Sequence, residues 1–373
     1  MSNILITFEV RDNTTDNNIQ GLITVLSKME VPYRVCKASR VTKSDIEWCD
    51  VYIANRPNSI YSQRISHAAK QSGRFVIVAL DDDIAHFPKS HPNHWKNKYV
   101  FKCLAIADSL MSPNILILDD FCGQYNLRRV LTISFIQDGE LKKEHPIGEK
   151  IRIVYPAGKD HIELFDRYIQ PFFNNFVKKY SDKVDVTFVG IEPKVQASNA
   201  VHFVEGMPYN NYLAFMETHD FDIGLAPLDD NPFCARKYFA KYIEYSKYGI
   251  LGLYSNVKPY TFAVKDGYNG VLVDGTAEQW EKTLEEIFNA PEKINLLLRN
   301  AQNDLTDKYS LENAVNRLKE GVPEIINYHS DLSRVKFNNI DLQRIVYSIR
   351  DFANKACYHL RHDGLSYVLR FLK

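Results

Sequence analysis

Short hydrophobic runs alternate with longer amphipathic stretches along most of the chain. In the first third, apolar runs predict strands at 4–8, 33–36, 51–54, 75–80 and 109–111. Between these runs, apolar residues recur at helical spacing over 17–29, 60–71 and 98–107. Strands rich in β-branched residues that alternate with helices are typical of a parallel sheet with helices on both faces.

A second series of the same kind follows a polar stretch at 137–150, which we interpret as an interdomain connection. Its predicted strands are 151–155, 184–189, 201–203, 222–226, 250–254 and 270–273. Its predicted helices are 161–179, 209–218, 235–248, 277–289 and 291–309. The pattern predicts an α/β protein with two Rossmann-like domains facing across a cleft. The expected ranges are 1–140 and 151–320, followed by a helical tail at 325–373.

The tail differs from the rest of the chain in both charge and pattern. Residues 334–373 carry eight basic and three acidic side chains, a net charge of +5, so the other residues together carry −5. Apolar residues from Leu342 to Leu360 recur at helical spacing, and a second apolar stripe follows Gly364. Such a basic amphipathic helix can lie on an anionic membrane, pack back onto the first domain or bind a protein partner.

Composition narrows the class of protein further. The 373 residues are 45% hydrophobic and 25% charged, as in soluble globular proteins, and 46 basic residues balance 46 acidic ones. The missing basic excess argues against a nucleic-acid partner. Six scattered cysteines predict reduced thiols. The chain starts without a secretory signal pattern and has no apolar run of about 18 residues, so we expect a cytoplasmic protein, either free or peripheral on the cytoplasmic membrane face.

The segment 221–275 carries a charged pattern with chemical meaning. Within the helix predicted at 235–248, Lys237, Lys241 and Glu244 have the spacing i, i+4, i+7, which brings them to one face. Such a face can be a solvated set of ion pairs. The helix, however, follows the carboxyl end of a strand, where open α/β sheets bind ligands and where helix N-termini favour anions. Two lysines suit a diphosphate, and a carboxylate suits ribose hydroxyls.

Four short motifs in this segment occur in a fixed order. They are DIGLAPL at 222–228, KYFAKYIEY at 237–245, SNVKPY at 255–260 and GYNG at 267–270. The segment resembles the donor-binding segment of GT-B glycosyltransferases, in particular the GT4-like group (glycosyl transferases group 1). The close resemblance covers about 55 residues, and the two-domain pattern extends it loosely over 1–320.

The resemblance implies roles for individual residues. Glu244 matches the carboxylate that binds the ribose of a nucleotide sugar, and Lys237 and Lys241 match catalytic cations near the donor diphosphate. Pro227, Arg236 and Tyr245 fall in the same donor-binding motifs. Many retaining members carry a second glutamate where this chain has Arg236, and the motif serine is replaced by Tyr238. The family typically needs no bound metal, so no cofactor beyond the nucleotide-sugar co-substrate is expected.

A second candidate for the donor diphosphate lies between the strand at 151–155 and the next helix. Gly158 allows a backbone to approach a phosphate, and Lys159 or His161 could neutralise its charge. The alternative is an ordinary helix N-terminus.

The candidates for acceptor binding lie in the first domain. Asp81, Asp82 and Asp83 follow a strand, where they could hold sugar hydroxyls, with Asp82 as general base. Helix capping in a solvated loop and a divalent cation are the alternatives. Arg11 and Asp12, after the first strand, are further candidates for acceptor contacts, and the loop at 55–57 is similar; in both loops an ordinary polar role is the alternative.

These features together predict a glycosyltransferase. It would move a sugar from a nucleotide-diphosphate donor to a hydroxyl of a saccharide or a lipid-linked saccharide, in cell-surface polysaccharide or glycoconjugate assembly. The expected partners are that donor, that acceptor and an anionic membrane surface at 334–373. A GT-B-fold nucleotide-sugar epimerase is one alternative. The other is a non-catalytic subunit that binds nucleotide or sugar, which Arg236 keeps open.

Overall fold

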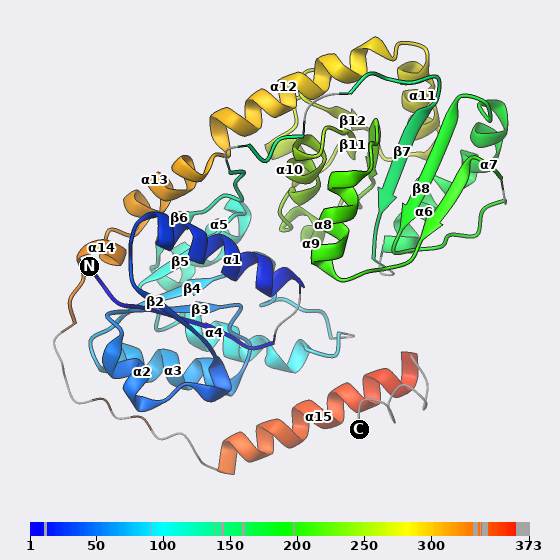
Figure 1. Ribbon diagram of the computed structural model, residues 1–373. Helices are drawn as coiled ribbons and strands as arrows, with labels where there is room; N and C mark the ends of the chain where they lie inside the picture. Colours follow the sequence, from blue (N-terminus) through cyan, green and yellow to red (C-terminus); the bar gives the residue numbers. More distant parts are fainter. Residues whose placement is uncertain are drawn as a thin grey trace. The chain divides into compact units, whose positions relative to one another are not determined.

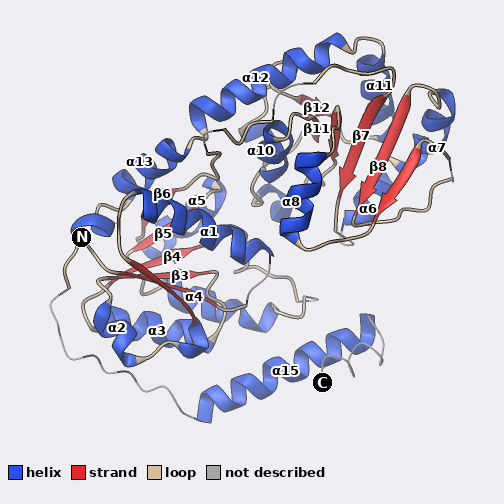
Figure 2. Cartoon of the chain, in the orientation of Figure 1, coloured by secondary structure: helices blue, strands red, loops and turns tan. Residues whose placement is uncertain are grey.

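The chain forms two compact units. The computed structural model describes residues 1–10, 13–89, 91–137, 139–142, 145–158, 161–196, 198–330, 335, 337 and 342–362. The first unit comprises residues 1–132 together with 315–373, and the second comprises residues 133–314. Each unit contains one six-stranded parallel sheet accompanied by helices, as Figure 1 and Figure 2 show.

The sheet of the first unit has the strand order β2-β1-β3-β4-β5-β6. The strands are β1 (Ile4–Phe8), β2 (Tyr33–Lys37), β3 (Val51–Asn55), β4 (Phe75–Ala79), β5 (Ser109–Ser112) and β6 (Arg128–Leu131). The helices are α1 (Asn13–Lys28), α2 (Lys43–Trp48), α3 (Ile60–Gln71), α4 (Asn97–Leu104), α5 (Ile115–Tyr125), α14 (Glu324–Asn327) and α15 (Leu342–His362). The order reverses between β1 and β3, and open α/β sheets bind ligands beside such a switch point.

The sheet of the second unit has the order β12-β11-β10-β7-β8-β9, with its switch point between β7 and β10. The strands are β7 (Ile151–Pro156), β8 (Val184–Val189), β9 (Val201–Val204), β10 (Ile223–Ala226), β11 (Leu251–Ser255) and β12 (Val271–Val273). The helices are α6 (Ile162–Tyr168), α7 (Gln170–Lys179), α8 (Tyr209–Thr218), α9 (Pro232–Ala235), α10 (Ala240–Lys247), α11 (Ala277–Phe288) and α12 (Glu292–Lys308). The helix α13 (Leu311–Gly321) spans the boundary to the first unit. The second sheet has the strand order of dinucleotide-binding Rossmann folds.

Residues 324–328 are an integral part of the first unit. The Ser2 hydroxyl donates to the Glu324 carbonyl at 2.7 Å, and the Tyr328 hydroxyl donates to the Gly73 carbonyl at 2.7 Å. Arg128, on β6, forms an ion pair with the Glu324 side chain. These bonds tie the first strand and the far sheet edge to residues more than 190 positions later.

Two long predicted helices are each divided in the structure. The helix predicted at 161–179 is interrupted at Ile169, because Pro171 has no amide hydrogen and its ring is tolerated only in the first turn of a helix, here that of α7. The helix predicted at 235–248 is also wrong. Ala235 is the last residue of the separate short helix α9, and α10 begins only at Ala240. Between them, the Phe239 ring is buried against Tyr242 and Tyr309. Aromatic residues are weak helix formers, so this anchoring outweighs continuation of the helix.

Most of the many aromatic rings build cores. In the second unit Phe165, Phe173 and Phe188 pack edge to face or tilted with centroids 5.1–5.5 Å apart. All six cysteines are free thiols, four of them buried. Among the described residues, no helix is long and apolar enough to cross a membrane.

Candidate functional site

Two loops lie side by side at the switch point of the second unit. β7 and β10 pair in register, Ile153 opposite Ile223, so the loops that leave their carboxyl ends start next to each other. Gly190, after β8, has φ +87°, and a Cβ there would stand 2.6 Å from the Ala157 carbonyl oxygen. The glycine therefore allows the chain after β8 to approach the β7 loop closely.

The predicted residues of these loops have different environments. Gly158 is exposed and its carbonyl accepts the His161 amide at 2.9 Å, at the start of α6. Pro227 is buried, and the next residue, Leu228, donates its amide to the Ser255 hydroxyl at 2.8 Å. Lys159 lies outside the described residues. Gly158 is thus accessible at the end of β7, whereas Pro227 is packed inside the unit.

A charged cluster joins α8 to α10. Lys241 Nζ lies 2.8 Å from Glu244 Oε1, and the Tyr212 hydroxyl donates to the same oxygen. Burial raises the pKa of Tyr212, and the neighbouring charge of Glu244 raises it further, so the phenol keeps its proton and acts as donor. Both donors reach Oε1; among the described residues none donates to Oε2. The cluster therefore presents an oriented carboxylate with one oxygen available to ligand hydroxyls.

Tyr212 was not predicted from the sequence. It lies 29 positions before Lys241, on a different helix, and nothing in its local pattern marks it. In the sequence Tyr212 is simply one tyrosine of the helix α8, and Tyr209 lies on the same helix, so the sequence does not single out Tyr212.

Lys237 and Arg236 do not share the face of Glu244, because they lie in the connection between α9 and α10. The Arg236 guanidinium donates to the Pro232 carbonyl at 2.8 Å, and Lys237 Nζ lies 5.4 Å from the centroid of the Phe233 ring. The prediction that Lys237, Lys241 and Glu244 form one helix face is therefore wrong. Lys241 and Glu244 are brought together on α10.

Tyr245 supports the site and does not line it. Its side chain is fully buried, and its hydroxyl donates to the Leu225 carbonyl in β10 at 2.8 Å. A Cβ at Gly224 would stand 2.5 Å from the Tyr245 ring, which explains the glycine of the DIGLAPL motif. Its contact with β10 fixes α10, and with it Glu244, so a role of Tyr245 in donor binding would be one of support.

Two further motif residues also serve the fold. Asp222 precedes β10, at the strand end away from the ligand loops, and accepts hydrogen bonds from Arg152 and from His145 at 2.6–3.1 Å. Asn269 is buried, accepts the Lys265 amide at 2.6 Å and donates to the Ala263 carbonyl at 3.0 Å. The motif segment 221–275 therefore contains residues that stabilise the fold as well as residues of the candidate site.

The switch point of the first unit is rich in satisfied polar groups. Glu9, just after β1, accepts hydrogen bonds from the hydroxyls of Ser59 and Ser62 at the start of α3. Burial raises the pKa of Glu9, although the two serine hydrogen bonds oppose that shift. Arg56 has φ +50°, a conformation uncommon for a residue with a side chain, and its guanidinium binds both oxygens of Asp81 at 2.7 Å.

The other predicted acceptor residues lie in different environments. Asp83 is buried, and its carboxylate lies 3.0 Å from Nδ1 of His86, whose ring stacks on Phe121. Asp82 is half-buried between its two neighbours. No group of three or more described His, Cys, Asp or Glu side chains could hold a metal ion. Arg11 and Asp12 lie outside the described residues.

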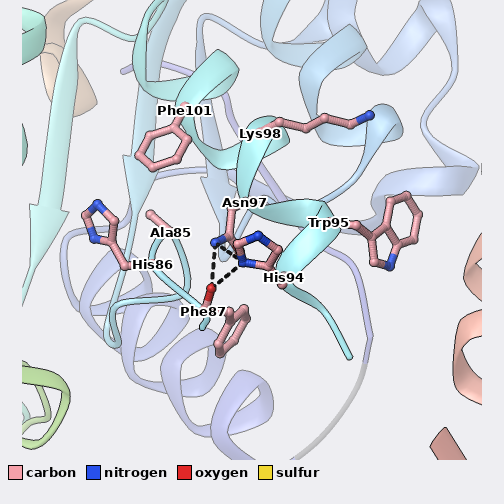
Figure 3. A pocket seen from close by; sticks show the side chains of 8 residues that line it. All are labelled: Ala85, His86, Phe87, His94, Trp95, Asn97, Lys98 and Phe101. Atoms are coloured by element: carbon pink, nitrogen blue, oxygen red, sulfur yellow. Dashed lines mark hydrogen bonds between the residues drawn. The ribbon is translucent and has the colours of Figure 1, made fainter. Parts of the chain in front are cut away.

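A pocket of about 520 Å³ opens directly after this acidic run (Figure 3). Its lining residues come from the loop after β4 and from the start of α4: Ala85, His86, Phe87, His94, Trp95, Asn97, Lys98 and Phe101. His94 and the Asn97 amide both contact the Phe87 carbonyl, at 2.6 and 3.0 Å. Asn97 Oδ1 and Trp95 Nε1 are buried atoms with no hydrogen-bond partner in the described part of the chain.

The lining of this pocket suits a sugar ring. Aromatic faces such as that of Phe101 stack on the apolar faces of sugars, and the His86 ring and the Lys98 ammonium can hydrogen-bond hydroxyl groups. Sequence reasoning missed the pocket. Its signal is the density of aromatic and histidine residues over 86–101, which matches no metal-ligand spacing and carries no other familiar motif.

Comparisons with known proteins identify the type of fold. No protein-family model and no curated protein matches the sequence. Anabaena HepE, solved with UDP-glucose, matches with a TM-score of 0.62 and 12% identity, over 87% of this chain and 100% of that one. A glycosyltransferase from Rickettsia africae matches with 0.61 and 11% identity, over 87% and 98%. A putative UDP-N-acetylglucosamine 2-epimerase from Listeria monocytogenes matches with 0.56 and 12% identity, over 86% and 96%.

At such low identity these likenesses show the fold alone. The fold is GT-B-like, with two Rossmann-like units and further helices at the C-terminal end, so the predicted fold class is confirmed. Membership of the GT4-like group stays a prediction.

Proposed function

We propose that the protein is a glycosyltransferase that uses a nucleotide-diphosphate sugar. The observation that carries the proposal is the Glu244 carboxylate, oriented by Lys241 and Tyr212 through one oxygen while the other faces no described donor. This arrangement suits the two hydroxyls of a ribose. HepE was solved with UDP-glucose, so a protein of this fold does bind a nucleotide sugar.

The donor diphosphate would lie against the loop after β7. There Gly158 would bring backbone close to the phosphates, and His161, Lys159, Lys237 and Lys241 would supply positive charge. In the transfer step the acceptor oxygen bonds to the anomeric carbon of the sugar. The bond from that carbon to the donor phosphate oxygen breaks, and the diphosphate leaves with the electron pair. The lysines and the backbone amides stabilise that charge, which is the main source of catalysis in this scheme.

The acceptor would occupy the first unit. Its sugar ring would lie in the pocket at 85–101, and Asp82 would take the proton from the attacking hydroxyl. Asp81 and Asp83 would hold further hydroxyls or position Asp82, since both already have protein partners. The acceptor class we propose is a saccharide or a lipid-linked saccharide of cell-surface glycoconjugate assembly.

A thermal-shift screen against UDP, GDP, dTDP, ADP and CMP tests the donor site. We expect one diphosphate to raise the melting temperature, with or without EDTA, and Glu244→Gln to lose most of that shift while keeping the melting temperature of the free protein. If no nucleotide shifts the melting temperature, the proposal fails and a non-catalytic subunit is favoured.

Product analysis separates transfer from the second candidate function. A nucleotide-sugar 2-epimerase of this fold would convert the donor into a new nucleotide sugar without an acceptor, and the Listeria match keeps this candidate in view. The aromatic pocket at 85–101, which could take an acceptor sugar, favours transfer. We therefore expect mass spectrometry to find free nucleoside diphosphate and a heavier acceptor.

A further inference from the structure

The helix α15 packs on the first unit with its polar side. The ring of Tyr347 is buried among Tyr61, Trp95 and Tyr99, with centroids 5.1–5.7 Å away. Asp351 follows Tyr347 by four residues, which places both side chains on one face of the helix. The helix is therefore attached to the first unit by specific contacts.

Ion pairs strengthen the same face. Lys96 Nζ lies 2.5 Å from one oxygen of Asp351, and Lys355 Nζ lies 2.9 Å from the other. Burial alone would raise the pKa of Asp351, but hydrogen bonds from the two lysines outweigh it and lower that pKa. The Arg344 guanidinium lies 4.4 Å from the Tyr61 ring centroid. The carboxylate of this helix is thus engaged in docking.

The opposite face of α15 is apolar and exposed. Its large side chains have exposed fractions between 45% and 64%: Ile345, Val346, Ile349, Phe352 and Leu360. At about 100° per residue they fall within one arc of roughly 120°, opposite Tyr347 and Asp351. A helix on a globular protein normally turns its apolar stripe inward. This helix does the reverse, so its apolar stripe is left for another partner.

The charges on α15 indicate what that partner is. The described helix carries the cations Arg344, Arg350, Lys355 and Arg361 against the single acid Asp351. The cations lie on both sides of the apolar arc, and none lies within it. Arg344 and Arg350 also stack on Tyr61 and Trp95, and Lys355 pairs with Asp351, while these guanidinium and ammonium groups border the arc. An apolar phase bordered by anions is the headgroup region of an anionic bilayer. In the sequence, residues 363–373 continue this character with four aliphatic residues and two further cations.

We propose that α15 lies in the interface of an anionic membrane, with Ile345, Ile349 and Phe352 inserted among the lipids. The same helix contacts Trp95, which also lines the pocket at 85–101. The membrane surface would therefore be fixed relative to that pocket, which suits an acceptor carried by a lipid. Membrane binding itself does not depend on the proposed function; only the choice of a lipid-linked acceptor rests on it.

Vesicle flotation tests the proposal with the full chain and no substrate. We expect the protein to float with vesicles of phosphatidylcholine and phosphatidylglycerol, and to float at least tenfold less with phosphatidylcholine alone or in high salt. The variant I349E/F352E should lose at least tenfold in bound fraction. Both side chains are exposed, so its melting temperature should equal that of the native chain.

The matched control places the same charges on the second unit. Leu296 and Phe262 are 55% and 41% exposed there, so L296E/F262E should float like the native protein. Equal flotation of native protein and I349E/F352E overturns the proposal, as does failure of the native protein to float. Light scattering without lipid tests whether a second copy of this chain covers the apolar face instead. A native dimer that I349E/F352E dissociates would assign the face to that second copy and would also overturn the membrane proposal.

Discussion

The two units each have a parallel sheet with polar residues near its switch point, but these residues are held in different ways. In the first unit the carboxylates of Glu9, Asp81 and Asp83 are each held by a protein group, and the nearby pocket offers aromatic faces. In the second unit, Glu244 is held through one oxygen only, by Lys241 and Tyr212. The first arrangement suits a neutral, ring-shaped ligand, and the second suits a charged one with vicinal hydroxyls.

The comparison also separates residues that hold the sheets from residues that meet a ligand. In the second unit Asp222, Gly224 and Tyr245 belong to the motif segment and yet serve β10 and α10. Substitutions at these positions should lower stability. Substitution of Glu244 should lower activity alone.

The largest effect is expected at Glu244. Glu244→Ala removes a charged acceptor of ligand hydrogen bonds, which costs about 2–4 kcal/mol, or roughly a 30- to 1000-fold loss of kcat/KM. The measurement is turnover of the nucleotide sugar found in the thermal-shift screen. Glu217→Ala, which removes an exposed carboxylate from α8, is the matched control and should keep full turnover. A folded Glu244→Ala protein with full turnover would falsify the donor-site assignment.

The second effect is on stability, at Asp222. Burial alone would raise the pKa of Asp222, but hydrogen bonds from His145 and Arg152 outweigh it and lower that pKa. Its contribution is therefore present above the unfolded pKa of about 4 and is lost as pH falls through the folded pKa. Asp222→Asn should cost about 3 kcal/mol at pH 7, because it leaves a partly buried cation without its partner.

Urea unfolding at pH 7 and at pH 3 checks this effect. The difference between Asp222→Asn and the native chain should shrink at the lower pH. A difference that is equal at both pH values would show that the charge of Asp222 is not what stabilises the second unit.

The third prediction compares one glycine from each unit. Gly224→Ala places a Cβ into the Tyr245 ring and should destabilise by about 2 kcal/mol. Gly123 lies within α5, and a Cβ added there would have nothing within 4 Å, so Gly123→Ala should be neutral or stabilise by up to about 1 kcal/mol. Chemical denaturation of both variants measures the contrast. Equal destabilisation by both would contradict the close packing of α10 on β10.

The smallest effect is expected at Glu9. Because burial raises its pKa, the ionised form is disfavoured in the folded state, and stability is lost as pH rises from the unfolded pKa through the folded one. Glu9→Gln keeps a hydrogen-bond acceptor for Ser59 and Ser62 without the charge. It should raise the melting temperature at pH 7 by about 2 °C and leave it unchanged at pH 4. Calorimetry at the two pH values measures this shift. A lower melting temperature of the variant at pH 7 would show that the Glu9 charge stabilises the folded state.

The sequence predicted the sheets better than the sites. Strands such as Ile4–Phe8 and Val184–Val189 are continuous β-branched runs, and their position in a parallel sheet follows from alternation with helices. The edge strand β6 has only four residues, two of them exposed arginines, so it carries no such run. The break before α10 depends on where Phe239 is buried, which no local pattern encodes.

The site was predictable only where one segment holds its residues. Lys241 and Glu244 lie one helical turn apart, so spacing alone brings them together. Tyr212 reaches them from another helix, and Arg56 reaches Asp81 from another strand, so both depend on tertiary packing. Motif resemblance singled out this segment but could not tell that Tyr245 faces inward.

The closure of the first unit by residues beyond 314 bears on how the chain folds as it is synthesised. The second unit is one continuous stretch, 133–314, and all of its strands have emerged before the first unit receives its last helices. Domains generally fold as units from the N-terminal side during synthesis. Here the part made first must wait for some of its contacts, because Ser2 and Arg128 gain their Glu324 partner only after the whole second unit has been made. A released chain truncated after residue 314 should therefore hold a folded second unit and an unfinished first one.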